Sequence, residues 1–186
     1  QPADTSASLH IQALVQRCAT RRRFRRGALL IQQGDSGDSL YVVLSGRLRA
    51  FVADAHGKEL TLGQYGALDY VGEMSLDGGT RSAHVEALEA TECAVVQRAE
   101  LLAYIADHPE FALVLLSRVI RRARMATDSA RNLALLDVYG RLSRLLTAMA
   151  EPPDARGWRR LREPVTQQML AQHLACSRRS EERRVG

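Results

Sequence analysis

The spacing of apolar residues divides the chain into a short helical start, a stretch of brief apolar runs, and a helical remainder. Residues 9–18 carry apolar side chains at helical spacing, which predicts a first helix. Between residues 28 and 96, short β-prone runs alternate with turn sequences rich in Gly, Asp and Ser. Such runs are typical of an antiparallel sandwich or barrel. The runs are residues 29–31, 40–44, 48–52, 60–62 and 94–96, with a hairpin expected around Gly57.

After Arg98 the apolar spacing becomes helical again. A short helix over 100–106 is expected to end before Pro109, because proline disfavours the helical conformation of the preceding residue. A long helix is predicted over 109–136. Its apolar and small residues alternate at spacings of three and four, the heptad pattern of a two-stranded coiled coil. These seam positions are Leu113, Leu116, Ile120, Ala123, Thr127, Ala130 and Ala134.

The long helix has two possible uses. A helix that lies only on its own β-domain shows a wider apolar stripe than a heptad seam. We expect both uses here, with the seam pairing with a second copy of the chain. The residues expected to face the β-domain are Phe111, Leu115, Val119 and Leu133.

The last quarter of the chain has the layout of a helix-turn-helix. Residues 137–140 interrupt the long helix, 141–150 resume it, and 158–165 are expected to form a short strand pair or an extended arm. Thr166 is a predicted N-cap for a helix over 167–174, and Ser177 for the helix that follows a tight connection. Two short helices joined in this way are typical of DNA-binding modules.

Composition points to the same region. The chain has 26 basic and 21 acidic residues, a net charge of +5, and Lys58 is its one lysine. The arginine total has two explanations, codon bias in a GC-rich genome and recognition of phosphates and base edges. Its placement is more informative, because residues 137–186 alone hold ten basic and six acidic groups. A nucleic-acid contact is therefore expected there. The three separated cysteines, with no signal peptide or membrane span expected, favour a reducing, cytoplasmic setting.

The segment from Gly72 to Ala83 carries the most informative chemistry. Its glycines allow backbone N–H groups to turn toward an anion, and Arg81 with Ser82 can bind a phosphate. Glu73 would repel a phosphate, but it suits a sugar hydroxyl, so the pair suggests a sugar with one phosphate. The spacing equally allows a surface turn with an ordinary Glu–Arg ion pair.

These residues resemble a known family. Gly72 to Leu76 together with Arg81 to Ala83 is similar to the phosphate-binding cassette of cyclic-nucleotide-binding domains. Residues 132–141 resemble the hinge, and 175–178 the start of the recognition helix, of bacterial Crp–Fnr regulators. Gly34, Asp35, Gly37, Asp38, Tyr41 and Gly46 resemble the glycine frame of their β-roll. Over about 22–178 the chain is therefore similar to this family.

The resemblance implies a fold and a domain order. The fold is α+β, with an N-terminal antiparallel β-roll, a long dimerisation helix and a C-terminal winged helix-turn-helix. The implied domains are residues 1–108, 109–136 and 137–186. It also implies a homodimer, double-stranded DNA and RNA polymerase as partners, no bound cofactor, and cyclic AMP as effector, with cyclic GMP less favoured.

The resemblance also implies roles for individual residues. Glu73 and the Gly72 backbone would hold the ribose 2′-hydroxyl, and Arg81 and Ser82 the cyclic phosphate. In the family, two adjacent residues with hydroxyl groups reach the adenine. They correspond to positions 126 and 127 here, where Thr127 has a hydroxyl and Ala126 has none. The remaining implied ligand-binding residues are Leu62, Met74 and Ala83. The implied DNA-binding residues are Thr166, Gln168, Ser177 and Arg178.

The final residues depart from the family pattern, which continues the recognition helix and adds a wing. Residues 179–186 resemble the translation of a sequencing adapter. We therefore expect them to be non-native and the DNA-binding domain incomplete. A native stop codon after Gly186 in source DNA would refute this.

Other classes fit less well. A cupin-type enzyme needs clustered histidines, whereas the five here are scattered, and no catalytic triad or nucleotide-hydrolysis loop is present, so we expect no enzyme. A regulator that senses redox state or haem, and a cyclic-nucleotide module without DNA binding, are the remaining alternatives.

Overall fold

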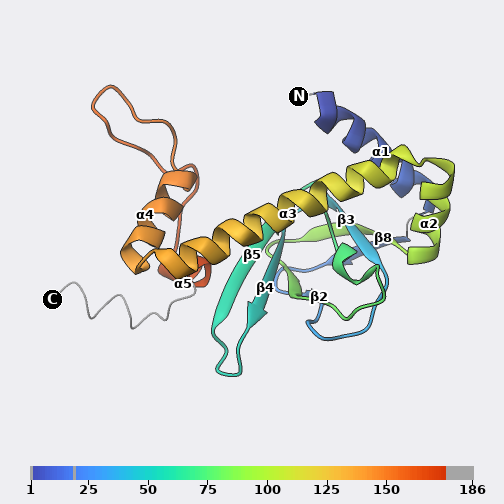
Figure 1. Ribbon diagram of the computed structural model, residues 1–186, viewed down its shortest axis with the longest axis horizontal. Helices are drawn as coiled ribbons and strands as arrows, with labels where there is room; N and C mark the ends of the chain where they lie inside the picture. The colour runs from blue at the N-terminus through green and yellow to red at the C-terminus, as the bar shows by residue number, and fades with distance from the viewer. Residues whose placement is uncertain (1, 19, 175–186) are drawn as a thin grey trace. The chain divides into compact units, whose positions relative to one another are not determined.

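A computed structural model describes residues 2–18 and 20–174 of the chain (Figure 1). The chain divides into two compact units, and the boundary between them falls within the longest helix. The first unit contains Gln1–Val52 and Leu62–Arg122, and the second contains Ala53–Thr61 and Ala123–Gly186. Among the described residues, no helix combines the length and apolar character that crossing a membrane requires.

The β-strands form two four-stranded antiparallel sheets. One sheet has the order β1-β8-β3-β6 and the other β2-β7-β4-β5. Residues of β3 alternate between two cores, because successive side chains of a strand point to opposite faces. Tyr41 and Val43 pack between the sheets, while Leu40 and Val42 face the helices. The strand bounds are β1 Thr20–Phe24, β2 Leu29–Ile31, β3 Leu40–Ser45, β4 Leu48–Ala53, β5 Glu59–Tyr65, β6 Tyr70–Val71, β7 His84–Ala87 and β8 Thr91–Val96.

Three helices cover the outer face of the first sheet. They are α1 (Pro2–Cys18), α2 (Arg98–Asp107) and the start of α3 (Glu110–Leu135). Ile11 and Leu14 of α1 are fully buried in this layer, and so is Phe111 of α3. α2 starts at a reciprocal capping box, in which Gln97 and Glu100 satisfy each other's backbone N–H groups. Phe111 and Leu115 pack against this core as predicted, whereas Leu133, predicted to face the β-domain, is 40% exposed.

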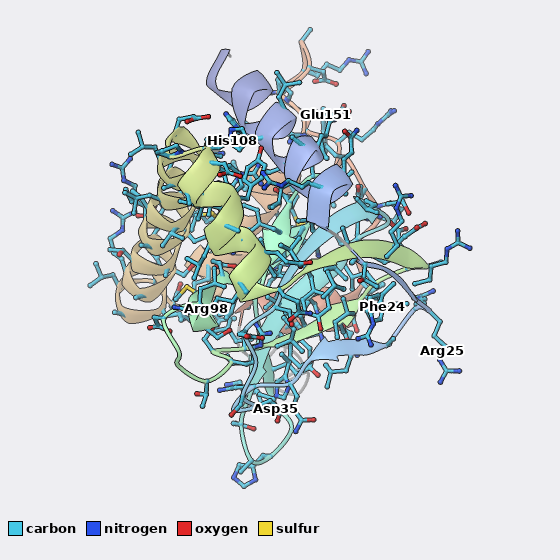
Figure 2. The ribbon with its side chains drawn as sticks, turned by 90° about the vertical axis from the view of Figure 1, so that its right-hand side faces the viewer. Phe24, Arg25, Asp35, Arg98, His108 and Glu151 are labelled. Atoms are coloured by element: carbon cyan, nitrogen blue, oxygen red, sulfur yellow. The ribbon has the colours of Figure 1, made fainter. Side chains whose placement is uncertain are left out.

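The strand prediction was incomplete. It missed β1, β6 and β7, and the first helix begins seven residues earlier than predicted. β1 contains three exposed arginines in succession, so it lacks the alternation that marks a half-buried strand. Its one inward side chain is Phe24, which packs on Tyr41, whereas the next residue, Arg25, points away from the sheet (Figure 2).

The β4–β5 hairpin, predicted around Gly57, is present. Asp54 closes its turn, because its carboxylate accepts hydrogen bonds from the backbone N–H groups of Lys58 and His56, both at 2.9 Å. The bond from Lys58 is the main reason that the pKa of Asp54 lies below its usual value. Gly57 adopts a left-handed conformation that suits glycine.

The second unit contains the C-terminal half of α3, α4 (Val138–Met149) and α5 (Gln167–Leu174). α4 is N-capped by Asp137, whose carboxylate accepts from the Gly140 N–H at 2.8 Å. The helix is therefore interrupted only at Leu136 and Asp137, and the longer break predicted over 137–140 was wrong. The Asp137 cap lets helical geometry resume at once.

The N-cap of α5 is confirmed, since the Thr166 hydroxyl accepts from the Met169 N–H at 3.1 Å. Between α4 and α5, an isolated bridge joins Ala150 to Leu161 in place of a strand pair over 158–165. The α+β class, with a β-roll followed by a long helix and shorter helices, is confirmed. The predicted second helix of the helix-turn-helix, with Ser177, Arg178 and residues 179–186, lies outside the described residues.

Candidate functional site

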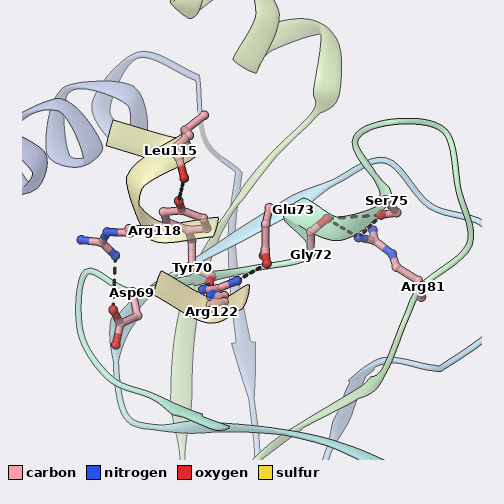
Figure 3. A network of polar contacts seen from close by, with 9 residues as sticks. All are labelled: Asp69, Tyr70, Gly72, Glu73, Ser75, Arg81, Leu115, Arg118 and Arg122. Carbon is pink, nitrogen blue, oxygen red and sulfur yellow. Dashed lines mark hydrogen bonds and ion pairs between the residues drawn. The ribbon is translucent and has the colours of Figure 1, made fainter. Parts of the chain in front are cut away.

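Arg81 is a buried arginine at the edge of the β-roll, with 7% of its surface exposed. Its Nη1 donates to the Gly72 carbonyl at 3.0 Å and to the Ser75 hydroxyl at 2.8 Å (Figure 3). Its Nη2 donates to the Ser39 carbonyl at 3.0 Å. All three partners are neutral acceptors, so they orient the guanidinium without neutralising its charge.

No carboxylate among residues 2–18 and 20–174 forms an ion pair with Arg81. Buried charges in proteins are normally paired, because removing a charge from water without a counter-charge is costly. A guanidinium without such a counter-charge is suited to bind an anion with paired oxygens, such as a phosphate or a carboxylate. Arg81 is therefore the centre of a candidate anion site.

Two glycines make room for this guanidinium. A Cβ at Gly37 would lie 2.8 Å from Nε and Nη2 of Arg81, and a Cβ at Gly72 would lie 2.8 Å from Nη1. Gly72 also has a left-handed φ of 95°. Gly37 thus leaves room for this position of the guanidinium. Gly72 is needed for its backbone conformation and because a Cβ there would also lie 2.7 Å from the Ser39 carbonyl oxygen.

A short 3-10 turn, η1 (Glu73–Ser75), holds two further side chains of the candidate site, Glu73 and Ser75. Ser75 is buried, accepts from Arg81, and donates to the Gly72 carbonyl at 3.2 Å. Sequence analysis had not singled out Ser75. A hydroxyl within a glycine-rich segment that also contains a candidate anion-binding arginine is the signal that could have found it.

Glu73 forms an ion pair with Arg122 of α3 (Figure 3). The Glu73 side chain is 6% exposed, and Arg122 also donates to the Tyr70 carbonyl. Burial alone would lower the pKa of Arg122, but the hydrogen bond and charge of Glu73 outweigh burial and raise it. Sequence analysis did not single out Arg122, because no local pattern indicates a partner so distant in the chain.

Two tyrosine rings flank the Arg122 guanidinium. Its Cζ lies 4.8 Å from the centre of the Tyr65 ring and 5.1 Å from that of Tyr70, within the range of cation–π contacts. Tyr70 also donates its hydroxyl hydrogen to the Leu115 carbonyl at 3.3 Å. Burial raises the pKa of Tyr70 to about 12 and raises that of Tyr65. Both phenols therefore stay neutral at physiological pH.

The remaining residues predicted for the ligand site vary in exposure. Leu62 and Met74 are 48% and 54% exposed, Ser82 is exposed, and Ala83 is half-buried. Thr127 lies in the part of α3 that belongs to the second unit, where it is exposed and its hydroxyl donates to the Ala123 carbonyl at 3.0 Å. Their roles in binding stay predictions.

The residues predicted for DNA binding lie near the end of the described chain. Thr166 caps α5 and is exposed, and so is Gln168 in the first turn of that helix. Ser177 and Arg178 lie outside the described residues. The structure therefore brings together Gly72, Glu73 and Arg81, and adds Ser75, Arg122 and two tyrosines.

Comparison with known proteins agrees with this geometry. A model of the cyclic nucleotide-binding domain matches residues 21–108. The cAMP-activated global transcriptional regulator CRP of Salmonella typhimurium is 33% identical over 152 residues, which cover 80% of this chain and 72% of that protein. The chain belongs to the Crp–Fnr family of transcriptional regulators. Another relative, the CRP-like regulator of Mycobacterium tuberculosis, is 30% identical over 158 residues, 83% of this chain and 70% of that protein.

Solved structures of Crp–Fnr regulators share the fold. The c-di-GMP responsive global regulator CLP of Xanthomonas campestris has a TM-score of 0.81 at 27% identity, covering 95% of this chain and 88% of that chain. The Thermus thermophilus catabolite activator protein has a TM-score of 0.58 at 31% identity, covering 94% and 80%. The resemblance inferred from the sequence is therefore confirmed. The names of these relatives give different effectors, cAMP for CRP and c-di-GMP for CLP.

Proposed function

We propose that this chain is a cyclic-nucleotide-responsive, DNA-binding transcriptional regulator whose effector is cyclic AMP. The observation that carries the proposal is the buried Arg81 guanidinium, which has neutral acceptors and no carboxylate partner among the described residues. A cyclic phosphate bears a single negative charge and two oxygens that accept from a guanidinium. Binding it would neutralise the buried charge of Arg81.

The other cassette residues complete the proposed binding mode. Ser82 is exposed next to Arg81 and offers a hydroxyl to the phosphate. The Glu73 carboxylate accepts a hydrogen bond from the ribose 2′-hydroxyl, and the Gly72 backbone N–H donates one to it. Met74, Ala83 and Leu62 supply apolar surface around the nucleotide.

The ion pair of Glu73 with Arg122 supports a route from ligand to dimer helix. A ribose hydroxyl that hydrogen-bonds to Glu73 acts on a carboxylate already held by α3. A ligand shifts a conformational equilibrium only through contacts that differ between the two states. We assign those contacts to the Glu73–Arg122 pair and to Thr127, the polar member of the heptad seam.

The proposed partners are a second copy of the chain, double-stranded DNA and RNA polymerase, in the cytoplasm. In support of the dimer, the seam residues Leu113, Leu116 and Ile120 are 66%, 52% and 44% exposed in the single chain. For DNA, Thr166 and Gln168 are assigned to phosphates, and Arg178 to a guanine in the major groove.

A second effector class has support from one residue. Ala126 stands where the family resemblance implies a hydroxyl that reaches adenine. Without this hydrogen bond to adenine, the preference of the site for cyclic AMP over guanine nucleotides is weaker. Cyclic GMP and cyclic di-GMP are therefore the alternatives that the test includes.

Calorimetric titration of the full chain with cyclic AMP, cyclic GMP and cyclic di-GMP tests the proposal. We expect cyclic AMP to bind most tightly and Arg81→Gln to abolish binding. Arg98→Gln is the matched control, because Arg98 is exposed and donates to the Leu76 carbonyl at 2.9 Å. Absence of binding by any of the three nucleotides overturns the proposal and favours a redox or haem sensor.

A further inference from the structure

We propose that Tyr65, presented over Gly63, is a specificity-determining residue that hydrogen-bonds to the nucleobase of the bound nucleotide. The inference rests on the proposed cyclic-nucleotide site and names the residue of β5 that reads the base. Neither the cassette motif nor the heptad seam contains this residue.

Tyr65 lies on the inner side of β5. The burial of β5 alternates over its last four residues, with Leu62 and Gln64 exposed and Gly63 and Tyr65 less exposed. Tyr65 packs against the core between the two sheets, which contains Ile31, Ala50 and Val85. Its side chain is therefore turned toward the interior of the β-roll.

Gly63 determines where the phenol hydroxyl lies. A Cβ at Gly63 would be 2.9 Å from the Tyr65 hydroxyl and 3.2 Å from its Cζ. The ring thus extends back along the strand and covers the position where any other residue would carry a side chain. The position of the Tyr65 hydroxyl therefore depends on both residues, because a side chain at position 63 would displace it.

The Tyr65 hydroxyl is available to a ligand. It has no hydrogen-bond partner among the described residues, and it is not among their fully buried unsatisfied atoms. The hydroxyl is therefore partly accessible to solvent, and its hydrogen-bonding capacity is open to a ligand group. Because burial raises its pKa, the phenol keeps its proton and can both donate and accept.

The neighbours of Tyr65 connect it to the proposed ribose site. Arg122 lies against the Tyr65 ring at 4.8 Å, and the same guanidinium is ion-paired with Glu73. In a nucleotide, the carbon that bears the 2′-hydroxyl is bonded directly to the carbon that bears the base. A ribose held by Glu73 therefore places its base close to the residues that surround Arg122, and of the two described tyrosines there Tyr65 has the hydroxyl without a hydrogen-bond partner.

Tyr65→Phe tests this role, since it keeps the ring and its contact with Arg122 and removes only the hydroxyl. We expect the affinity for the preferred cyclic nucleotide to fall about threefold to tenfold. Affinities for the weaker nucleotides should fall less, so the ratio between cyclic AMP and cyclic GMP moves toward one. A structural role alone would lower all affinities together and leave this ratio unchanged.

Gly63→Ala provides a second variant that removes no hydrogen-bonding group. Its Cβ displaces the Tyr65 hydroxyl, so we expect the same change in ratio, with thermal melting recorded to confirm folding. Gly66→Ala is its control, because nothing lies within 4 Å of a Cβ there and its backbone is not left-handed. Tyr41→Phe is the control for hydroxyl removal in the same core.

The outcomes separate the two proposals. If the wild-type chain binds a nucleotide and Arg81→Gln abolishes binding, while Tyr65→Phe leaves every affinity within twofold, the role of Tyr65 is overturned and the proposed function stands. If the wild-type chain binds none of the nucleotides, the proposed function fails first. A changed ratio in both Tyr65→Phe and Gly63→Ala supports the inference.

Discussion

The carboxylate of Glu73 is ion-paired with Arg122 of the long helix and not with Arg81, its neighbour in the sequence motif. The sequence allowed a surface turn in which Glu73 and Arg81 form an ordinary ion pair. Instead Arg81 is buried on neutral acceptors, and Glu73 is neutralised from another element. Within the described residues, one motif therefore holds a carboxylate with a counter-charge and a guanidinium without one, an arrangement that suits a sugar hydroxyl and a phosphate.

The Glu73–Arg122 pair is expected to contribute measurably to stability. A double-mutant cycle with Glu73→Gln and Arg122→Gln, followed by urea unfolding, should give a coupling free energy of about 1–3 kcal/mol, because both partners are largely shielded from water. The more exposed pair of Arg118 with Asp69, at 3.2 Å, is the control and should give a smaller value. A coupling near zero for Glu73 with Arg122 would contradict the geometry.

Substitution of Gly37 tests the space reserved for Arg81. In Gly37→Ala the new Cβ meets the guanidinium, which must move away from its three acceptors. We expect nucleotide affinity to fall about tenfold or more, with a small loss of stability because a flexible side-chain end moves. Gly66→Ala has open space around its Cβ and should leave the affinity unchanged. Equal affinities of the two variants would argue against this arrangement.

Stability is expected to fall under alkaline conditions. Burial raises the pKa of Cys93 to about 12 from 9.0, and that of Tyr70 to about 12 from 10.0. Above pH 9 the unfolded chain loses these protons while the folded chain keeps them, so the unfolding free energy decreases as pH rises toward 12. Urea unfolding in reducing buffer between pH 7 and 10.5 measures this decrease. Cys93→Ala should be less stable at pH 7 but show a shallower decrease above pH 9, and an unchanged slope would contradict the assignment.

The heptad seam predicts the oligomeric state. Leu116→Asp introduces a charge into the seam and should convert a dimer to a monomer in sedimentation velocity, because a buried unpaired charge is costly at a helix interface. Met125→Asp is the matched control, since Met125 is 55% exposed on α3 but lies outside the seam. If both variants stay dimeric, another surface forms the dimer.

Thr127 is expected to contribute to ligand binding and not to helix stability. Thr127→Ala should weaken nucleotide binding about threefold to tenfold, through loss of one hydrogen bond to the base. Thr147→Ala of α4 removes the same type of intrahelical bond, from a threonine hydroxyl to the carbonyl four residues earlier, and should leave binding unchanged. A Thr127→Ala variant with full ligand-dependent DNA binding would exclude the proposed role.

The sequence by itself determined the elements that depend on local patterns. Helical spacing located α2 and α3, and the hydroxyl of Thr166 predicted the cap of α5. The spacing of Glu73 and Arg81 allowed either a sugar-phosphate site or an ordinary ion pair. β1 was missed because its exposed arginines carry no alternation, and because its pairing with β8 joins segments far apart in the chain.

Only the tertiary structure decided which partners those residues have. Arg122 pairs with Glu73, and Tyr65 lies beside Arg122, because folding brings α3, the 3-10 turn and β5 together. No local periodicity specifies such contacts, since burial and charge compensation depend on elements that are distant in sequence. The motif therefore indicated a candidate ligand site, whereas packing determined that Arg81 has no carboxylate partner among the described residues.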